Sequence, residues 1–161
     1  MDLSIADLLV AATPSDGSPK WTREEAERFA SHVKVDEHGC WQWQAEVTFG
    51  YGRVHFRDGR WRSHRLSFVV LVGPIPDGLV IDHLCRNRAC CNPDHLEAVT
   101  PRTNVLRGEG IAATNAAKTH CPKGHPYSPW NTERRRNGGR RCRACRSISA
   151  RARYLRMKEA S

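Results

Sequence analysis

The sequence predicts an α+β fold, and three observations support this class. Short segments of alternating apolar residues stand between turn-forming residues, and other segments begin with residues that cap helices. Six of the seven cysteines fall in two stretches that also contain histidines. Apolar residues make up 39% of the 161 residues, which supports a small core and excludes a wholly disordered chain.

The beginning of the chain predicts a flexible leader followed by a helix. Breaker residues crowd positions 13–19, so we expect residues 1–20 to be flexible, although the apolar segment 5–10 is compatible with a helical turn. Thr22 and Glu25 form a capping box, which predicts a helix over residues 23–32. The first residues lack the basic segment of a signal peptide.

The middle of the chain predicts short strands joined by turns and two further helices. Asp58-Gly59 is a hairpin turn, Gly73-Pro74 ends a helix, and Thr100 caps a helix that starts at Pro101. The expected elements are a strand at 40–44, a hairpin at 51–56 and 60–63, a helix at 64–72, strands at 79–81 and 96–99, and a helix from 101 to 108 or 110. Residues 111–118 form a helical piece or a linker, and good helix formers fill 148–160.

Positive charge is concentrated in the last quarter of the chain. Residues 118–161 contain 13 Lys+Arg and 2 Asp+Glu, whereas residues 1–117 contain 13 and 15, so the formal net charge of +9 comes from the final segment. Arginine dominates there, and its planar guanidinium suits bidentate contacts with phosphate. We interpret this segment as a nucleic-acid-binding arm; a solvated tail that aids solubility is the alternative.

A first candidate metal site lies in a polar loop. Cys85, Cys90 and His95 have four residues between each pair. Thiolates and imidazoles are ligands of structural zinc, and metal binding orders a loop that apolar burial cannot. Cys40 is available as a fourth ligand, and Cys91 could replace Cys90. The alternative is that the loop cysteines are small buried residues and His95 is a polar cap.

A second candidate metal site has a zinc-ribbon pattern. Cys121 and His125 form one closely spaced pair, and Cys142 and Cys145 form the other. A segment of this size has no core of its own, so a metal would hold it together. Free cysteines on a disordered tail are the alternative.

A group of chemically active residues surrounds the first loop. Asp82 and His83 stand where a predicted buried strand ends, and Asn104 lies on the helix that starts at Pro101. An imidazole can accept a proton from water, and Asp and Asn oxygens suit Mg²⁺. The alternatives are that Asp82 caps a turn, His83 is a further zinc ligand and Asn104 is a surface residue.

The run from Asp82 to Leu96, followed by Thr100 and Asn104, resembles the ββα-metal endonucleases, also named HNH or His-Me finger endonucleases. It is most similar to the HNH proteins of bacteriophages, and its loop is similar to that of the His-Cys box homing endonucleases. The resemblance covers about residues 38–108. It also rests on Cys40-Trp41-Gln42-Trp43, Gly50-Tyr51-Gly52-Arg53, His64-Arg65-Leu66 and the segment 73–78.

The resemblance implies a role for each residue of the motif. His83 would be the general base that activates the attacking water, and Asn104 and Asp82 would hold one catalytic Mg²⁺ or Mn²⁺. One structural zinc would be held by Cys40, Cys85, Cys90 and His95, and the ribbon would hold a second at Cys121, His125, Cys142 and Cys145. His95 stands where the plain HNH pattern has asparagine, so zinc would take over the ordering of the loop. The implied fold is a small ββα-metal core with a β-hairpin, a zinc-stapled loop, and a C-terminal zinc ribbon with a basic helix.

These features together predict a metal-dependent DNA endonuclease that nicks or cuts double-stranded DNA. A DNA-binding zinc protein without catalysis and an RNA-directed nuclease or RNA-binding ribbon are the alternatives. The expected domains are a leader at 1–20, an HNH nuclease domain at 21–117 and a basic zinc-ribbon unit at 118–161. The arginines expected to contact DNA are Arg62, Arg65, Arg86, Arg88, Arg140, Arg141, Arg143 and Arg146.

The sequence also bears on assembly and location. A homing-type double-strand cut would favour a symmetric homodimer, whereas many phage HNH enzymes are expected to act as monomers. The chain has no run of eighteen apolar residues, so we expect no membrane span. We expect a cytoplasmic protein, in the bacterial host cell if a phage encodes it.

Overall fold

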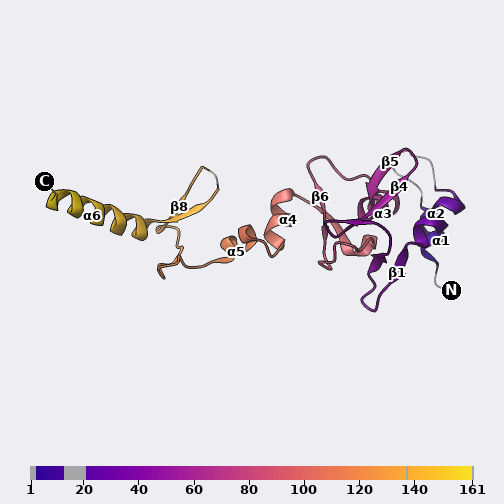
Figure 1. Cartoon of the computed structure of the whole chain (residues 1–161), viewed down its shortest axis with the longest axis horizontal. Coiled ribbons are helices and arrows are strands. Elements are labelled where there is room, and N and C mark those ends of the chain that lie inside the picture. The colour runs from indigo at the N-terminus through magenta and orange to yellow at the C-terminus, as the bar shows by residue number, and fades with distance from the viewer. Residues whose placement is uncertain (1–2, 13–20, 137, 161) are drawn as a thin grey trace. The chain divides into compact units, whose positions relative to one another are not determined.

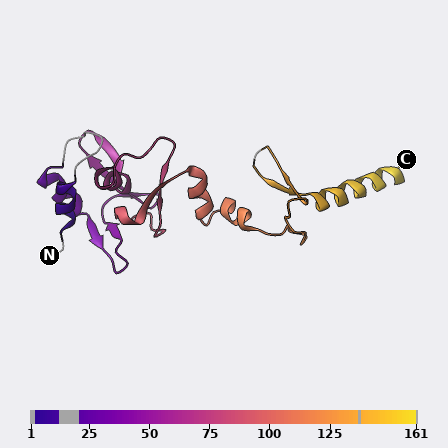
Figure 2. The ribbon, with the colours of Figure 1, turned by 180° about the vertical axis from the view of Figure 1, so that it is seen from behind.

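The computed structural model describes residues 3–12, 21–136 and 138–160, which fall into two compact units, residues 1–104 and 105–161 (Figure 1 and, from behind, Figure 2). In chain order the elements are α1 (Ile5–Ala11), α2 (Arg23–Ala30), β1 (Val33–Val35), β2 (Trp41–Trp43), β3 (Val47–Thr48), β4 (Tyr51–Phe56), β5 (Gly59–Arg62), α3 (Ser63–Leu71), β6 (Val80–His83), the short 3-10 helix η1 (Pro93–His95), β7 (Leu96–Val99), α4 (Pro101–Arg107), α5 (Ile111–Ala117), β8 (Thr132–Arg134), β9 (Arg140–Cys142) and α6 (Arg143–Glu159). All strand pairs are antiparallel, and this mixture of helices and small sheets confirms the predicted α+β class. None of the described helices has the length and apolar character needed to cross a membrane.

The first two helices pack against each other, and both begin with a capping box. The box of Thr22 at α2 was predicted, and Ser4 forms an equivalent box at α1. Helix α1 contradicts the predicted flexible leader, because Leu9 is completely buried in the core of the first unit. Breaker residues follow the helix directly, but its apolar face is covered by the helix that comes after them. Residues 1–2 and 13–20 lie outside the described part of the chain.

Aromatic side chains form the main core of the first unit. The ring of Trp21 stacks on Phe56 with 4.4 Å between centroids, and Phe29 lies 5.0 Å from Trp43. Cys91 joins this core with no exposed surface. Large rings supply much buried area per residue, so a few of them can stabilise a small domain.

Two hairpins follow β2, and each turns through two residues. β4 pairs Phe56 with Gly59 of β5, so the turn is Arg57-Asp58, one position earlier than predicted. Arg57 has a φ of 50°, a conformation rare for a residue with a side chain, and its guanidinium pairs with Glu25 at 3.0 Å. That ion pair anchors the turn residue to α2.

Strands β6 and β7 and helix α4 form a ββα unit. β6 pairs with β7 in a register that sets Asp82 opposite Glu97 and His83 opposite Leu96. The predicted cap of α4 is confirmed, because the Thr100 hydroxyl accepts the backbone N–H of Thr103 at 3.1 Å. The chain between the two strands has little regular structure apart from η1.

The second unit has almost no apolar core. Among its described residues only Ala113, Cys121 and Cys142 are buried. Helix α6 starts five positions before the expected 148–160, because the Cys142 thiol accepts the N–H of Cys145 and caps it. Residues 111–117 form a helix, as one of the two alternatives expected. Burial of apolar surface therefore does little to hold this unit together.

We expect Leu9→Ala to destabilise the first unit by about 2–5 kcal/mol, because it removes a fully buried side chain and leaves a cavity between the first two helices. Chemical denaturation followed by tryptophan fluorescence measures the change in free energy of unfolding. Leu3→Ala is the matched control, since Leu3 is 65% exposed. Equal stability of the two variants would show that α1 does not pack on the core.

Candidate active site and metal centres

The candidate active site lies where β6 ends. Asp82 and His83 are its last two residues, and both are buried. Two rings from other elements lie beside His83: His64 from α3 with centroids 4.6 Å apart, and Tyr51 from β4 at 5.8 Å. Elements that are distant in the sequence thus converge on one imidazole.

The backbone of the metal loop holds His83 in one orientation. Its Nε2 lies 3.2 Å from the carbonyl oxygen of Cys90. A carbonyl can only accept, so Nε2 carries the hydrogen and Nδ1 of the neutral ring has the lone pair. Nδ1 is the atom that can accept a proton. The restraint on His83 is thus a direct hydrogen bond to the metal loop.

The surroundings of His83 favour its neutral form. Burial lowers the pKa of His83, and the positive charges of Arg88 and Arg86 lower it further, against the opposing effects of the Cys90 carbonyl and Asp82. A base must be unprotonated to act, and lowering the pKa keeps it so near neutral pH.

His64 is a second buried imidazole of the site. Burial, together with charges on His83, Arg65 and Arg62, lowers the pKa of His64 to about 3. Its Nδ1 is buried and without a hydrogen-bond partner. The ring therefore stays neutral and packs edge-on against His83. Sequence reasoning assigned no role to His64 and did not place Tyr51 beside His83, although both stand in the segments that carry the resemblance.

Asp82 brings a carboxylate to the same strand end. Its Oδ1 accepts a hydrogen bond from Nη1 of Arg86 at 2.9 Å. Arg86 has a φ of 60°, so the backbone of this loop residue is in the left-handed region. A carboxylate is a suitable oxygen ligand for Mg²⁺, and here it also pairs with a cation.

Asn104 lies in the first turns of α4, directly after β7. It is half-buried and belongs to the same compact unit as His83. The ββα arrangement thus carries Asp82, His83 and Asn104 on adjoining elements, as expected. Their joint role as a metal-and-base site remains a prediction.

The first metal centre combines ligands from two parts of the chain. The donor atoms of Cys40, Cys85, Cys90 and His95 all lie within 4.8 Å of one another. Nδ1 of His95 is 3.4 Å from the Cys40 sulfur and 3.6 Å from the Cys90 sulfur. Tetrahedral zinc would separate such atoms by about 3.6 Å. These four residues can therefore hold a metal ion.

Cys91 is a core residue and not a member of this cluster. Its side chain has no exposed surface, and its thiol donates to the Trp41 carbonyl at 3.3 Å. Burial raises the pKa of both thiols, so the positions of the two sulfur atoms, and not their pKa values, distinguish Cys90 from Cys91. The adjacent Cys90 occupies the ligand position. The conformation of the loop therefore directs Cys90 toward the other metal ligands and Cys91 toward the core.

The second metal centre joins a tight turn, a hairpin and a helix. The donor atoms of Cys121, His125, Cys142 and Cys145 lie within 4.8 Å of one another. The Cys145 sulfur is 3.6 Å from that of Cys121 and 3.3 Å from Nδ1 of His125. Hydrogen bonding to the N–H of Cys145 lowers the pKa of Cys142, which favours its thiolate form. This cluster can also hold a metal ion.

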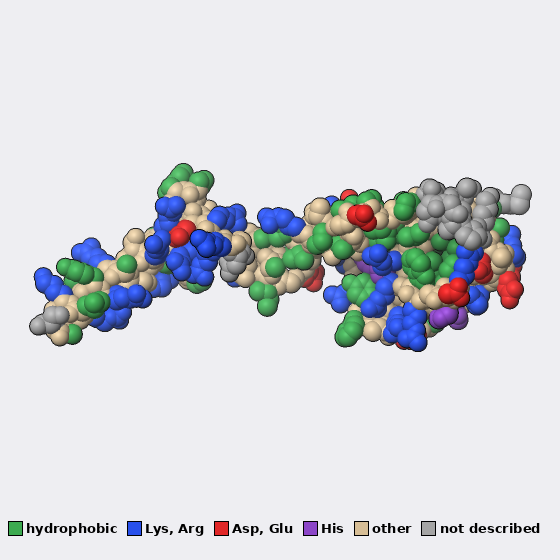
Figure 3. Space-filling view, turned by 90° about the horizontal axis from the view of Figure 1, so that it is seen from above, with side chains coloured by type: hydrophobic (Ala, Val, Ile, Leu, Met, Phe, Trp, Pro, Cys, Tyr) green, Lys and Arg blue, Asp and Glu red, His purple; other side chains and the backbone are tan. Residues whose placement is uncertain are grey.

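The arginines expected to bind DNA have different surroundings. Arg62 and Arg88 lie over the Tyr51 ring, at 5.3 and 5.5 Å from its centroid, and Arg65 is half-buried on α3. In the second unit Arg146 pairs with Glu133, Arg140 lies over Tyr127 and hydrogen-bonds the Asn115 carbonyl, and Arg141 and Arg143 are exposed. Figure 3 shows Lys and Arg side chains crowded on this unit. Contact with nucleic acid remains a prediction for each of them.

Part of the chain matches a known protein family. Residues 62–106 match the model of a family described as HNH endonuclease. This span runs from the last residue of β5 to α4 and includes the β6 strand end and the loop. The predicted resemblance to phage-type HNH proteins is confirmed by this match and by the phage relatives.

Three curated phage proteins are similar to the chain. "Protein 2.8" of Escherichia phage T7 is 36% identical over 85 residues, 50% of this chain and 57% of that protein. The "Uncharacterized gene 5.3 protein" of Enterobacteria phage T3 is 42% identical over 57 residues, 34% and 50% of the two chains, and "Protein 7.7" of Escherichia phage T7 is 36% identical over 66 residues, 40% and 51%. The chain spans about half the length of these relatives. No solved structure matches.

Substitution of Cys90 and of Cys91 tests which of these adjacent cysteines is a metal ligand. We expect Cys90→Ser to lower the metal content by one ion per chain, because Cys90 belongs to the four-residue cluster. Cys91→Ala is expected to keep the metal and to lower only the stability, since it deletes a buried core thiol. Elemental analysis of the two purified variants measures the metal. Loss of an ion from the Cys91 variant alone would reverse the assignment.

Proposed function

We propose that this chain, which carries an HNH domain over residues 62–106, is a metal-dependent endonuclease that hydrolyses phosphodiester bonds of double-stranded DNA. The observation that carries the proposal is the buried, oriented His83 at the end of β6, with Nδ1 as its basic nitrogen. Family membership of this segment supports nuclease chemistry. The substrate, the metal and the number of strands cut are parts of the proposal.

In the proposed reaction His83 takes a proton from water through Nδ1 as the water oxygen attacks the phosphorus. The bond between phosphorus and the 3′ oxygen breaks, and that oxygen takes a proton from solvent. The hydrogen bond to the Cys90 carbonyl holds the ring, so the base does not have to be oriented during the reaction. Asp82 and Asn104 would hold Mg²⁺ or Mn²⁺, and the ion would supply positive charge to stabilise the departing oxygen. The guanidinium groups of Arg62 and Arg88 lie over the Tyr51 ring, and that ring lies 5.8 Å from the ring of His83. In the proposed complex both arginines contact the phosphate backbone beside His83.

The two metal centres are proposed to hold zinc in structural roles. Their ligands are three cysteines and one histidine each, the distances between donor atoms suit a tetrahedron, and every ligand position is filled by a side chain. Neither centre has a carboxylate or an open position for a reacting water. The second unit, with its excess of positive charge, is proposed to supply much of the affinity for DNA.

One observation favours a second candidate function, that of a DNA-binding protein without catalysis. The Arg86 guanidinium pairs with the Asp82 carboxylate, which the endonuclease mechanism assigns to the metal. A permanent ion pair there would remove one metal ligand. The phage relatives lead us to propose the cytoplasm of a bacterial host as the place of action for either function.

A plasmid-nicking assay separates the two functions. We expect the chain to nick supercoiled plasmid with Mg²⁺, and His83→Ala to lower the rate by about 10²–10⁴-fold, because it removes the general base. DNA binding, measured by gel shift without Mg²⁺, is expected to survive. His38→Ala is the matched control, since His38 is exposed and lies in the turn between β1 and β2. Unchanged nicking by the His83 variant would refute the assignment, and binding without nicking by the native chain would favour the non-catalytic function.

Metal analysis tests the identity of the structural ions. We expect two zinc ions per chain by inductively coupled plasma mass spectrometry, because two complete ligand sets are present. Chelation is expected to unfold the second unit first, since burial contributes little to its stability. A content of zero or one zinc, or another metal in their place, would contradict the proposal.

A further inference from the structure

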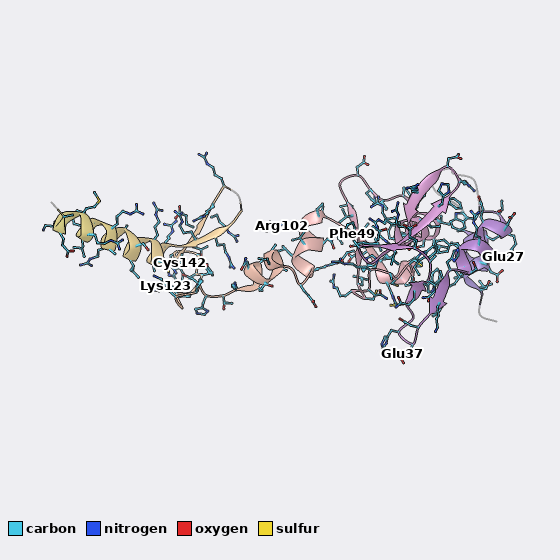
Figure 4. The ribbon with its side chains drawn as sticks, viewed as in Figure 1. Glu27, Glu37, Phe49, Arg102, Lys123 and Cys142 are labelled. Carbon is cyan, nitrogen blue, oxygen red and sulfur yellow. The ribbon has the colours of Figure 1, made fainter. Side chains whose placement is uncertain are left out.

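Phe49 stands at the tip of a tight hairpin and has no cover. It is 84% exposed, the most exposed large apolar side chain among the described residues (Figure 4). β3 and β4 pair Thr48 with Tyr51, so Phe49 and Gly50 form the two-residue turn. Their φ values, 53° and 83°, are those of a turn that usually contains Asn-Gly. A bulky aromatic residue is held in a strained position that its own preferences oppose.

Three arginine side chains fix this turn from different directions. Nη1 of Arg88 lies 3.5 Å from the Phe49 carbonyl oxygen, and the stem of Arg88 packs on Gly50. Nη1 of Arg62 donates to the Thr48 carbonyl at 2.8 Å, and Arg53 reaches the Thr48 hydroxyl. Arg53 is also paired with the Glu46 carboxylate at 3.5 Å, so the positive charge at the base of the exposed ring comes mainly from Arg62 and Arg88.

The turn is also tied to the candidate active site. Arg88 belongs to the loop between the metal ligands Cys85 and Cys90, so the metal centre that positions His83 also positions the turn. Tyr51 follows the turn directly and its ring lies 5.8 Å from that of His83. The aromatic tip thus has a fixed place close to the proposed reaction centre.

We propose that Phe49 is a wedge that inserts between stacked bases of duplex DNA beside the phosphate to be cleaved. The identity of the ligand rests on the proposed function. Apolar side chains at a rigid protrusion can part a base step when the adjacent phosphates are held by cations. The guanidinium groups of Arg62 and Arg88 would hold those phosphates, whereas an apolar protein surface would have to bury both charges. The strained turn is then explained, because it fixes the ring in an exposed position before DNA binds.

Unwinding of closed circular DNA tests the wedge without knowledge of a target sequence. The protein carries His83→Ala to prevent nicking and is bound to relaxed plasmid without Mg²⁺. A topoisomerase that needs no metal then relaxes the DNA, and the change in linking number per bound protein is read on a gel. We expect unwinding by this protein and its loss when Phe49→Asn is added, with binding weakened by at least about fivefold.

A folding check and two further variants keep the test specific. Phe49→Asn is expected to fold at least as well as the parent, because Asn-Gly suits the turn, and thermal denaturation checks this. Phe49→Leu should retain the unwinding, since leucine can also separate bases. Val47→Thr should have no effect, although Val47 is 53% exposed two positions away.

The outcomes separate the wedge from the proposed function. Equal unwinding by the parent and a folded Phe49→Asn variant, or no unwinding by the parent, overturns the wedge even if the native chain cleaves DNA. Unwinding that depends on Phe49, without nicking by the native chain in either Mg²⁺ or Mn²⁺, supports insertion of Phe49 into DNA and overturns the endonuclease assignment. Absence of DNA binding overturns both.

Discussion

The four-residue cluster of Cys40, Cys85, Cys90 and His95 is the constraint on which the rest of the first unit depends. Three of its members lie in a loop with few apolar side chains, and the fourth precedes β2. Backbone hydrogen bonds between this loop and β2 continue the link, including one from the Cys91 N–H to the Trp41 carbonyl at 2.9 Å. A metal bound there would therefore order the loop and fasten it to the aromatic core at the same time.

Hydrogen bonds from this loop position residues at the candidate active site and at the hairpin turn. The carbonyl of Cys90 orients His83, Arg88 holds the hairpin turn at Phe49, and Arg86 reaches the Asp82 carboxylate. A flexible polar loop could not place three groups at once, because each would lose conformational entropy separately. When a metal fixes the loop, that entropy is lost on metal binding, before any substrate arrives.

The two units differ in what stabilises them and in the charge they carry. The first unit has an apolar core and the residues suited to chemistry, whereas the second has few buried residues and the excess of positive charge. A segment of this size is too small to form an apolar core. A metal ion bound by the four ligands of the second unit would stabilise its fold instead. An apolar core and a strongly basic surface would compete for the same few residues in so short a segment.

The sequence by itself determined the helix caps at Thr22 and Thr100, the second ligand set and the pair Asp82-His83, because these depend on local spacing and residue chemistry. It predicted the α+β class and allowed a helical turn at residues 5–10, but it predicted neither the packing of helix α1 on the core nor the turn at Arg57. Only tertiary structure decided those, since α1 is stabilised by the burial of Leu9 and the Arg57 turn by a pairing with Glu25, 32 residues away. Tertiary structure likewise chose Cys90 over Cys91, brought His64 and Tyr51 to His83, and left Phe49 exposed at its turn. Such choices depend on which surfaces meet in space, and that information is not contained in any local segment of the chain.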